Sequence, residues 1–260
     1  STLIIDPGVS VVFQTANKLR MLVNGRILAE GNATDSIFFT AADIVNGFGG
    51  IRFISPAASN DSSKFRYCSF SYGKTGNSPY KHGGALYFEN WSKAIVFHSK
   101  ISNCTASKGG AIYIINSDVI ISNNYISNNS ATLGGGIYLE NSNNTISGNF
   151  INNNSAPNSA GGGIYFYSGN YMVTNNTISN NLANSGAGIF CNNGNIEFNF
   201  NTIINNTSLG FGNFDPVGGG LVLNSGTHNL NWNTISNNSA SGLSNCGTGG
   251  GLHCGSGTTI

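Results

Sequence analysis

Hydrophobic residues recur along most of the chain in short groups in which apolar and polar positions alternate. The clearest group follows a pair or triplet of small residues, mostly glycines, and its first hydrophobic residue returns every 25 to 32 residues. These residues are Leu86, Ile112, Ile137, Ile164, Ile189, Leu221 and Leu252. Because neighbouring side chains of a strand point to opposite faces, alternation over so few positions predicts short β-strands.

A second motif runs in step with the first. It begins with an isoleucine followed by a polar residue in most copies, and another hydrophobic residue lies five positions earlier. The isoleucines are Ile101, Ile126, Ile151, Ile178, Ile203 and Ile235, and the earlier residues are Val96, Ile121, Ile146, Val173, Phe198 and Leu230. Each repeat therefore holds three short strands separated by Asn-rich or Gly-rich turns.

A repeat of this size cannot bury its own apolar side chains, whereas stacked repeats place equivalent residues on top of one another. The pattern predicts an all-β parallel β-helix, a solenoid with three short strands in each coil of about 25 residues. The glycines are expected at corners that require positive φ or the absence of a Cβ atom. Asparagines at equivalent turn positions are expected to form hydrogen-bonded ladders.

The regularity differs between the two ends of the chain. We expect a single domain over residues 1–260, with irregular N-terminal coils in 1–80 and regular coils in 81–260. The run Gly49-Gly50-Ile51-Arg52-Phe53 resembles a degenerate first copy of the glycine motif. Solenoids normally end in a cap, and none is recognisable before Ile260, so we expect a stack that is truncated or continues at its C-terminal end.

Charge is scarce and unevenly distributed. The net charge is +1, and all eleven Lys and Arg residues lie between Lys18 and Lys108. This balance argues against a nucleic-acid partner, which would require clustered basic residues. No stretch approaches the 18 apolar residues of a transmembrane helix, so we expect no membrane-spanning segment.

Parallel β-helices often carry polysaccharide lyases or glycosidases, so the acidic residues need attention. Glu89 and Glu140 occupy the same position in coils two apart, with Ile115 between them. Because stacked strands lie about 4.8 Å apart, this places the two carboxylates about 10 Å apart. Glycoside hydrolysis requires two carboxylates about 5–10 Å apart, but two exposed turn acids explain the pair as well. The four histidines are scattered without metal-ligand spacing. We assign no catalytic residue, no metal and no cofactor.

An aromatic residue lies between the two interior positions of five successive glycine motifs. These residues are Tyr87, Tyr113, Tyr138, Tyr165 and Phe190. Their parity predicts an exposed aromatic ladder on one outer face. Two interpretations remain open: the rings stabilise the sheet by stacking, or they form a stripe that contacts a sugar or a protein.

Three further features are candidates for function. Loops lengthen at one corner, over residues 76–82, 208–217 and 240–248, and insertions on one face of a solenoid often form a binding face. Asn32, Asn60 and Asn90 begin Asn-x-Ser/Thr sequences and are candidate glycosylation sites. Among five cysteines, Cys68 and Cys104 could pair, whereas Cys191 and Cys254 are expected as buried apolar residues.

The paired motifs resemble the repeats of polymorphic outer-membrane proteins and, more broadly, right-handed β-helix repeats of adhesin-like surface proteins. The glycine motif matches at 83–86 and 109–112, and Phe150-Ile151-Asn152-Asn153 matches the second repeat. The resemblance covers roughly residues 65–260, and it implies export, surface display and adhesion.

These observations predict a non-enzymatic, secreted or cell-surface structural or adhesive element, which could be a subunit of an extracellular filament. The expected partners are further copies joined end to end, a glycan, or a surface protein. The alternative is a carbohydrate-active enzyme or glycan-binding module that uses the aromatic ladder.

Overall fold

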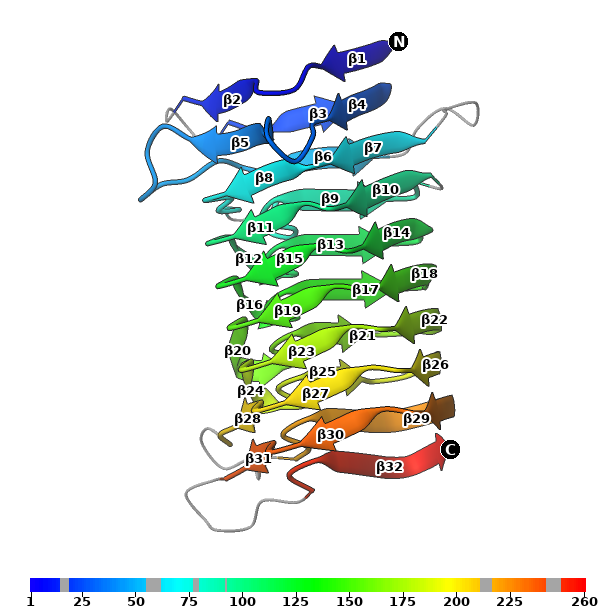
Figure 1. Cartoon of the computed structure of the whole chain (residues 1–260). Coiled ribbons are helices and arrows are strands. Elements are labelled where there is room, and N and C mark those ends of the chain that lie inside the picture. The colour runs from blue at the N-terminus through cyan, green and yellow to red at the C-terminus, as the bar shows by residue number, and fades with distance from the viewer. Residues whose placement is uncertain (15–18, 55–61, 77–79, 92, 211–216, 242–248) are drawn as a thin grey trace.

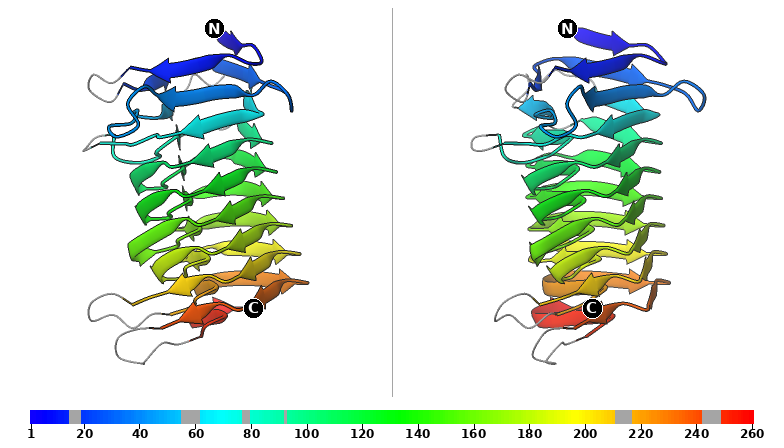
Figure 2. Two further views of the ribbon diagram at one scale, coloured as in Figure 1. Left: turned by 60° about the vertical axis from the view of Figure 1, so that its left-hand side comes forward. Right: turned by 90° about the vertical axis from the view of Figure 1, so that its left-hand side faces the viewer.

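The computed structural model describes residues 1–14, 19–54, 62–76, 80–91, 93–210, 217–241 and 249–260. Short parallel strands stack coil upon coil from the N-terminal to the C-terminal end (Figures 1 and 2). The strands form three sheets, with 17, nine and six strands. The expected β-solenoid with three sheets is therefore confirmed.

The 17-stranded sheet has two arms, which the chain enters one after the other in each coil. The upstream arm contains β3 (Met21–Val23), β6 (Ile51–Ile54), β9 (Leu86–Glu89), β13 (Ile112–Ile115), β17 (Ile137–Glu140), β21 (Ile164–Phe166), β25 (Ile189–Cys191), the first part of β29 (Leu221–Asn231), and β32 (Leu252–Thr259). The downstream arm contains β1 (Thr2–Ile5), β4 (Arg26–Glu30), β7 (Ser63–Arg66), β10 (Ala94–Phe97), β14 (Val119–Ser122), β18 (Ser142–Ser147), β22 (Gly169–Thr174), β26 (Asn195–Asn199) and the later part of β29.

The other two sheets follow in each regular coil. The nine-stranded sheet contains β2 (Ser10–Phe13), β5 (Ile37–Ala41), β8 (Cys68–Ser71), β11 (Lys100–Ser102), β15 (Tyr125–Ser127), β19 (Phe150–Asn152), β23 (Thr177–Ser179), β27 (Thr202–Ile204) and β30 (Thr234–Ser236). The six-stranded sheet contains β12 (Thr105–Lys108), β16 (Ser130–Leu133), β20 (Ser155–Ala160), β24 (Leu182–Ser185), β28 (Thr207–Ser208) and β31 (Ser239–Ala240).

The interior consists of columns of like residues, as the repeat predicts. In the upstream arm, Ile112 pairs with Leu86 on one side and with Ile137 on the other, and all three are fully buried. Val96 and Ile121 pair in the same way in the downstream arm. The columns reach into the irregular N-terminal part, because Ile51 pairs with Leu86. Met21 pairs with Ile51 in turn, an earlier coil that the glycine pattern does not reveal.

Two asparagine ladders support the corners on either side of the nine-stranded sheet. At the first corner, between the downstream arm and this sheet, the backbone N–H of Asn124 donates to Oδ1 of Asn149 over 2.9 Å, and its Nδ2 donates to the carbonyl of Val96 over 2.8 Å. At the second corner, in the same arrangement, the backbone N–H of Asn129 donates to Oδ1 of Asn154 over 3.1 Å. Because each buried amide satisfies backbone groups of neighbouring coils, the ladders hold the coils in register.

Glycine is required where the six-stranded sheet leads into the next upstream strand. Gly109 has a φ of +62°, a left-handed conformation that favours glycine. A Cβ atom on the following Gly110 would lie 2.1 Å from the carbonyl oxygen of Gly135. The glycine pair therefore allows both the tight turn and the close approach of successive coils, as expected from the sequence.

Candidate functional site

The aromatic ladder of Tyr87, Tyr113, Tyr138, Tyr165 and Phe190 exists, but its predicted exposure is wrong. Successive rings stack in parallel, with centroids 5.0 to 5.2 Å apart. Tyr113, Tyr138 and Tyr165 are 4%, 1% and 7% exposed, and the rings at both ends are half-buried. The stack therefore has little free aromatic surface for a sugar or a protein.

The six-stranded sheet covers the ladder. Leu133 at the end of β16 and Ala160 at the end of β20 pack against the tyrosine rings. Nζ of Lys108, at the end of β12, lies 4.6 Å from the centre of the Tyr138 ring. At the N-terminal end, the buried guanidinium of Arg52 lies 4.7 Å from the centre of the Tyr87 ring. The ladder is thus a second, smaller core outside the main one.

The two glutamates of the hypothetical hydrolase pair belong to this second core. The Tyr87 hydroxyl donates to Glu89 over 2.8 Å, and the Tyr113 hydroxyl donates to Glu140 over 3.2 Å. Lys108 forms an ion pair with Glu140 over 3.6 Å. Burial and the neighbouring glutamates hold the pKa of the Tyr113 phenol above its usual range. Both carboxylates therefore accept structural hydrogen bonds beside covered rings.

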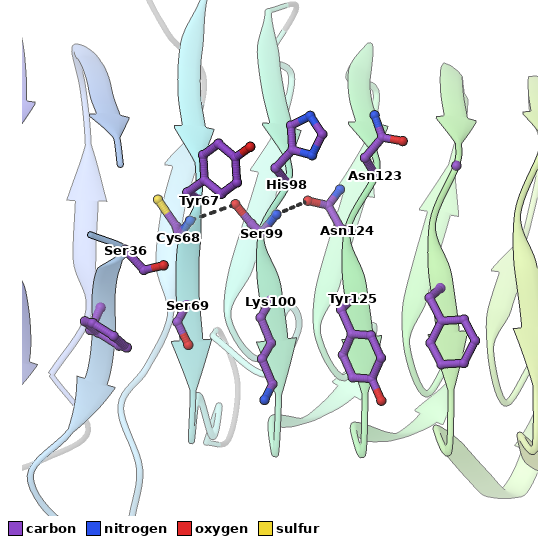
Figure 3. A pocket seen from close by; sticks show the side chains of 13 residues that line it. Ser36, Tyr67, Cys68, Ser69, His98, Ser99, Lys100, Asn123, Asn124 and Tyr125 are labelled. Carbon is purple, nitrogen blue, oxygen red and sulfur yellow. Dashed lines mark hydrogen bonds between the residues drawn. The ribbon is translucent and has the colours of Figure 1, made fainter. Parts of the chain in front are cut away.

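A different surface of the solenoid is hollowed. A groove of about 630 Å³ lies along the first corner and the adjoining outer face of the nine-stranded sheet (Figure 3). It is lined by Ser36, Phe38, Tyr67, Cys68, Ser69, His98, Ser99, Lys100, Asn123, Asn124, Tyr125, Gly148 and Phe150. These residues come from successive coils, so the long direction of the groove follows the stack.

Two rows of outward side chains form the walls of the groove. One row stands at the corner and includes Tyr67 and His98, whose rings stack with centroids 5.2 Å apart. The other row consists of the first residues of β11, β15 and β19 and the residues paired with them. In this second row Tyr125 and Phe150 stack, again at 5.2 Å, and are 41% and 37% exposed.

The floor between the rows is a continuation of the first asparagine ladder. The N–H of Cys68 donates to Oγ of Ser99 over 3.0 Å, and the N–H of Ser99 donates to Oδ1 of Asn124 over 2.9 Å (Figure 3). Burial raises the pKa of the Cys68 thiol to about 12, so this side chain stays protonated and is a poor nucleophile. The groove therefore has a hydrogen-bonded floor beneath two aromatic pairs, in which Tyr67 is half-buried and His98, Tyr125 and Phe150 are exposed.

The charge of the groove comes from a lysine. Lys100 lies between Ser69 and Tyr125 in the second row and is exposed. Within the described part of the chain it forms no ion pair. None of the residues that line the groove is Asp or Glu. Nζ of Lys100 lies 5.9 Å from the centre of the Tyr125 ring. The groove thus presents a cation without an acidic partner beside aromatic faces, which suits a ligand with flat apolar faces and negative charge.

Sequence reasoning missed this groove, although a signal was present. The second row coincides with the first position of the Phe-x-x-Asn-like motif, which is occupied by Phe150 in one coil and Tyr125 in the preceding one. The corner row occupies the position just before each ladder residue, where Tyr67 and His98 replace the usual Asn. Both signals are substitutions within a repeat rather than the repeat itself.

The remaining candidate residues are scattered. Asn32 and Asn90 are exposed, and Asn60 lies outside the described residues. Oδ1 of Asn32 accepts hydrogen bonds from Thr34 and Asp35, whereas Oδ1 of Asn90 accepts one from Asn116. Most of the three long loops also falls outside the described residues. The roles of these residues and loops in glycosylation and binding stay predictions.

The described cysteines are free thiols, including Cys68 and Cys104, which could have paired. Cys191 is buried as expected, but Cys254 is exposed, because it lies in the last described coil with no further coil against it. Over the same part of the chain, no cluster of three or more His, Cys, Asp or Glu residues could hold a metal ion. A helix long and apolar enough to cross a membrane is likewise not found there.

Comparison with known proteins bears on the fold. The family model described as right handed beta helix region matches residues 17–170 and 94–260. The two matches overlap, as expected when one repeat model fits a stack in more than one register. The comparison with curated proteins and the comparison with solved structures each found no match. The resemblance to adhesin-like proteins stays a prediction.

Proposed function

Because the chain belongs to the right-handed β-helix family, whose model covers most of it, we propose that it is a non-enzymatic adhesive element that binds an acidic glycan in the groove. The observation that carries this proposal is the arrangement of the groove: the exposed pair Tyr125 and Phe150 and the partly exposed pair Tyr67 and His98 lie beside Lys100 above a hydrogen-bonded floor. Its place at the cell surface, which the motif resemblance implies, is part of the proposal.

The aromatic pairs supply the contact area for a sugar. The apolar C–H face of a sugar ring can lie flat on an aromatic ring, which buries area without leaving polar groups unpaired. Tyr125 and Phe150 present their rings along the groove wall in consecutive coils, so they support stacking of neighbouring sugar units. His98, Ser69 and Asn123 add hydrogen-bonding groups at the same wall and the opposite one.

The lysine supports an acidic rather than a neutral sugar. A carboxylate or sulfate group on the ligand would pair with Lys100, which has no acidic partner of its own within the described residues. The lining contains no carboxylate that would repel such a group. Charge pairing at an exposed site contributes modestly to affinity, but it separates acidic from neutral chains of the same length.

The same lining favours binding over hydrolysis. Glycoside hydrolysis in most families needs an acid and a second carboxylate on opposite sides of the scissile bond. The residues that line the groove supply neither. The glutamates with suitable spacing in the sequence, Glu89 and Glu140, instead bind the hydroxyls of the covered tyrosines. We therefore propose retention of the glycan without cleavage.

The test uses short oligogalacturonates, which are linear and acidic, and cello-oligosaccharides of the same length, which are neutral. Calorimetry is expected to show that the parent chain prefers the acidic series. Tyr125→Ala and Phe150→Ala should each weaken binding about tenfold or more, equivalent to about 1.4 kcal/mol. Lys100→Gln should remove most of the preference for the acidic series.

The matched control is Tyr167→Ala, because Tyr167 is 42% exposed but lies outside the groove lining. It should leave binding unchanged. Equal affinity of the Tyr125 and Tyr167 variants would contradict the proposal, and release of new reducing ends from the glycan would contradict its non-enzymatic part. Labelling of intact source cells with an antibody tests surface display.

End-to-end assembly into a filament stays a prediction beside this function. Light scattering of the purified chain, together with electron microscopy of it and of the source material, tests assembly. A monomer without fibres in either sample would rule it out while leaving the groove unaffected.

A further inference from the structure

The corner that forms one wall of the groove carries a second pair of aromatic residues two coils beyond the groove's end. Phe200 and Trp232 stack with ring centroids 4.9 Å apart and an interplanar angle of 11°. They occupy the same position as Tyr67 and His98, directly before a ladder residue of the first corner. We call this pair the platform.

Phe200 is exposed for a reason other than nearness to the last coil, whereas Trp232 lies just before β30, which pairs with β27 alone among the described strands. Trp232 is 77% exposed and Phe200 is 54% exposed. Phe200 has neighbouring coils on both sides, since β27 pairs with both β23 and β30. Its exposure therefore reflects an outward direction at the corner, and the two rings stand in solvent.

The backbone under the platform is unfavourable for aromatic residues. Phe200 and Trp232 have φ angles of +58° and +53°, in the left-handed region. In neighbouring coils this position is held by Asn123, Gly148 and Asn175, residue types that tolerate this conformation. Bulky residues that are strained and exposed gain nothing from a core, so the strain points to a function for these rings.

The platform and the groove lie on one line. The outer row of the nine-stranded sheet runs in register from Phe38 through Phe150 and then through Thr177, Thr202 and Thr234. Strands in a sheet are about 4.8 Å apart, so the seven steps from Phe38 to Thr234 span about 34 Å. Between groove and platform the row presents threonines, and the corner presents small or amide side chains that leave the path open.

We infer that Phe200 and Trp232 form a second binding site for the same glycan, and that the ligand is a long linear chain lying parallel to the solenoid axis. This inference rests on the proposed function. The groove holds one stretch of the chain beside Lys100, and the platform stacks against a sugar farther along. Linking two contacts through one ligand raises the affinity for chains that reach both, without changing the affinity for chains that reach one.

The experiment uses size-fractionated oligogalacturonates, one fraction too short and one long enough to span the row. Calorimetry should show that the parent chain binds the long fraction at least about tenfold tighter than the short one. Phe200→Asn and Trp232→Asn should remove this difference while leaving the affinity for the short fraction unchanged. The variants are made in a host without N-glycosylation, because each creates an Asn-x-Thr sequence.

Asparagine is chosen because it tolerates the left-handed conformation, so these variants keep the corner folded. Trp232 also reports directly on occupancy, because the only other tryptophan, Trp91, is 1% exposed. Long chains should protect Trp232 fluorescence from quenching by acrylamide, and short chains should not.

The outcomes separate this inference from the function on which it rests. Unchanged long-chain affinity in both platform variants, with binding still lost in Tyr125→Ala, would overturn the platform and leave the groove intact. If the parent chain binds neither the short nor the long fraction, both the platform and the proposed function are wrong. If the platform variants instead change the mass measured by light scattering, the rings join copies of the chain and the glycan inference is wrong.

Discussion

The aromatic ladder and the groove contain the same kind of contact, aromatic rings stacked in successive coils, but differ in what lies over the rings. Leu133, Ala160 and Lys108 of the six-stranded sheet cover the ladder. Among the described residues, no such layer covers Tyr125 and Phe150, which are 41% and 37% exposed. Stacking alone therefore says nothing about function in a solenoid, because the layer outside the stack decides whether the rings support the fold or meet a ligand.

The largest expected difference between the two regions is in stability. Tyr138→Ala removes a ring that is 1% exposed and should lower the free energy of unfolding by about 3–5 kcal/mol, the range for losing a buried aromatic side chain. Tyr125→Ala, at an exposed position, should change it by no more than about 0.5 kcal/mol. Urea unfolding followed by circular dichroism measures both. Equal losses would show that the groove rings are structural.

The next effect concerns the floor shared by the groove and the first corner. Asn124→Ala leaves the Ser99 N–H and the Val96 carbonyl without their partners. Two buried polar groups left unpaired should lower stability by about 2–4 kcal/mol. Asn181→Ala at the second corner, outside the groove lining, is the matched control, because Asn181 likewise accepts from the N–H of Asn154 and donates to the carbonyl of Ile151. Only the Asn124 variant should also weaken glycan binding, because only Asn124 lines the groove.

The ladder also contains a titrating group that distinguishes it from the groove. His82 stacks on Tyr113 at 4.9 Å, and burial, with Lys108, Lys81 and Arg52 nearby, lowers its pKa from 6.5 to about 4. Between these values the unfolded chain binds a proton that the folded chain does not. Stability should therefore fall as the pH drops from about 6.5 to about 4.

His82→Phe keeps a ring on Tyr113 but cannot titrate, so its melting temperature should depend less on pH over that interval. Burial also lowers the pKa of His228, which contributes with the same sign and should account for part of the remaining slope. Thermal melts of the parent chain and of His82→Phe between pH 4 and 7 measure the contribution of His82. A slope unchanged in the His82 variant would show that the imidazole is solvated in the folded chain.

The fold could be predicted in detail because stacking converts sequence period directly into contact. Ile112 packs on Leu86 and Ile137 for no other reason than that they occupy equivalent positions in successive coils. The same logic predicted glycines at the corners, of which Gly109 is one, and asparagine ladders, of which the contact between Asn124 and Asn149 is an example. These contacts are local to neighbouring repeats, so they do not depend on distant packing.

The sites could not be predicted as well, because exposure depends on other sheets. The parity of Tyr138 correctly placed its ring on the outer side of the upstream arm, but parity cannot show that the six-stranded sheet folds over it. The groove, by contrast, was not predicted at all. Its second row reads Phe38, Ser69, Lys100, Tyr125 and Phe150, a column with no common residue type and hence no repeat signal.

The smallest expected effect lies at the corner and has the opposite sign from the others. Tyr67 stacks on His98, and its backbone has a φ of +46°, a conformation that Asn adopts more readily than Tyr. The Tyr67 ring is half-buried, and the Arg66 guanidinium lies 5.2 Å from its centre. Tyr67→Asn should nevertheless raise stability by about 0.5–1 kcal/mol, since relief of backbone strain exceeds the loss of these two contacts. The same variant should weaken binding to short acidic oligosaccharides, because it removes part of the groove wall.

A variant that is more stable and binds less would show that the corner aromatics are retained for the ligand, whereas loss of stability would show that their stacking supports the coil. Asn175→Ala provides the reference, because Asn175 occupies the same corner position in a coil where this position carries no aromatic ring. It should lower stability slightly and leave short-chain binding unchanged.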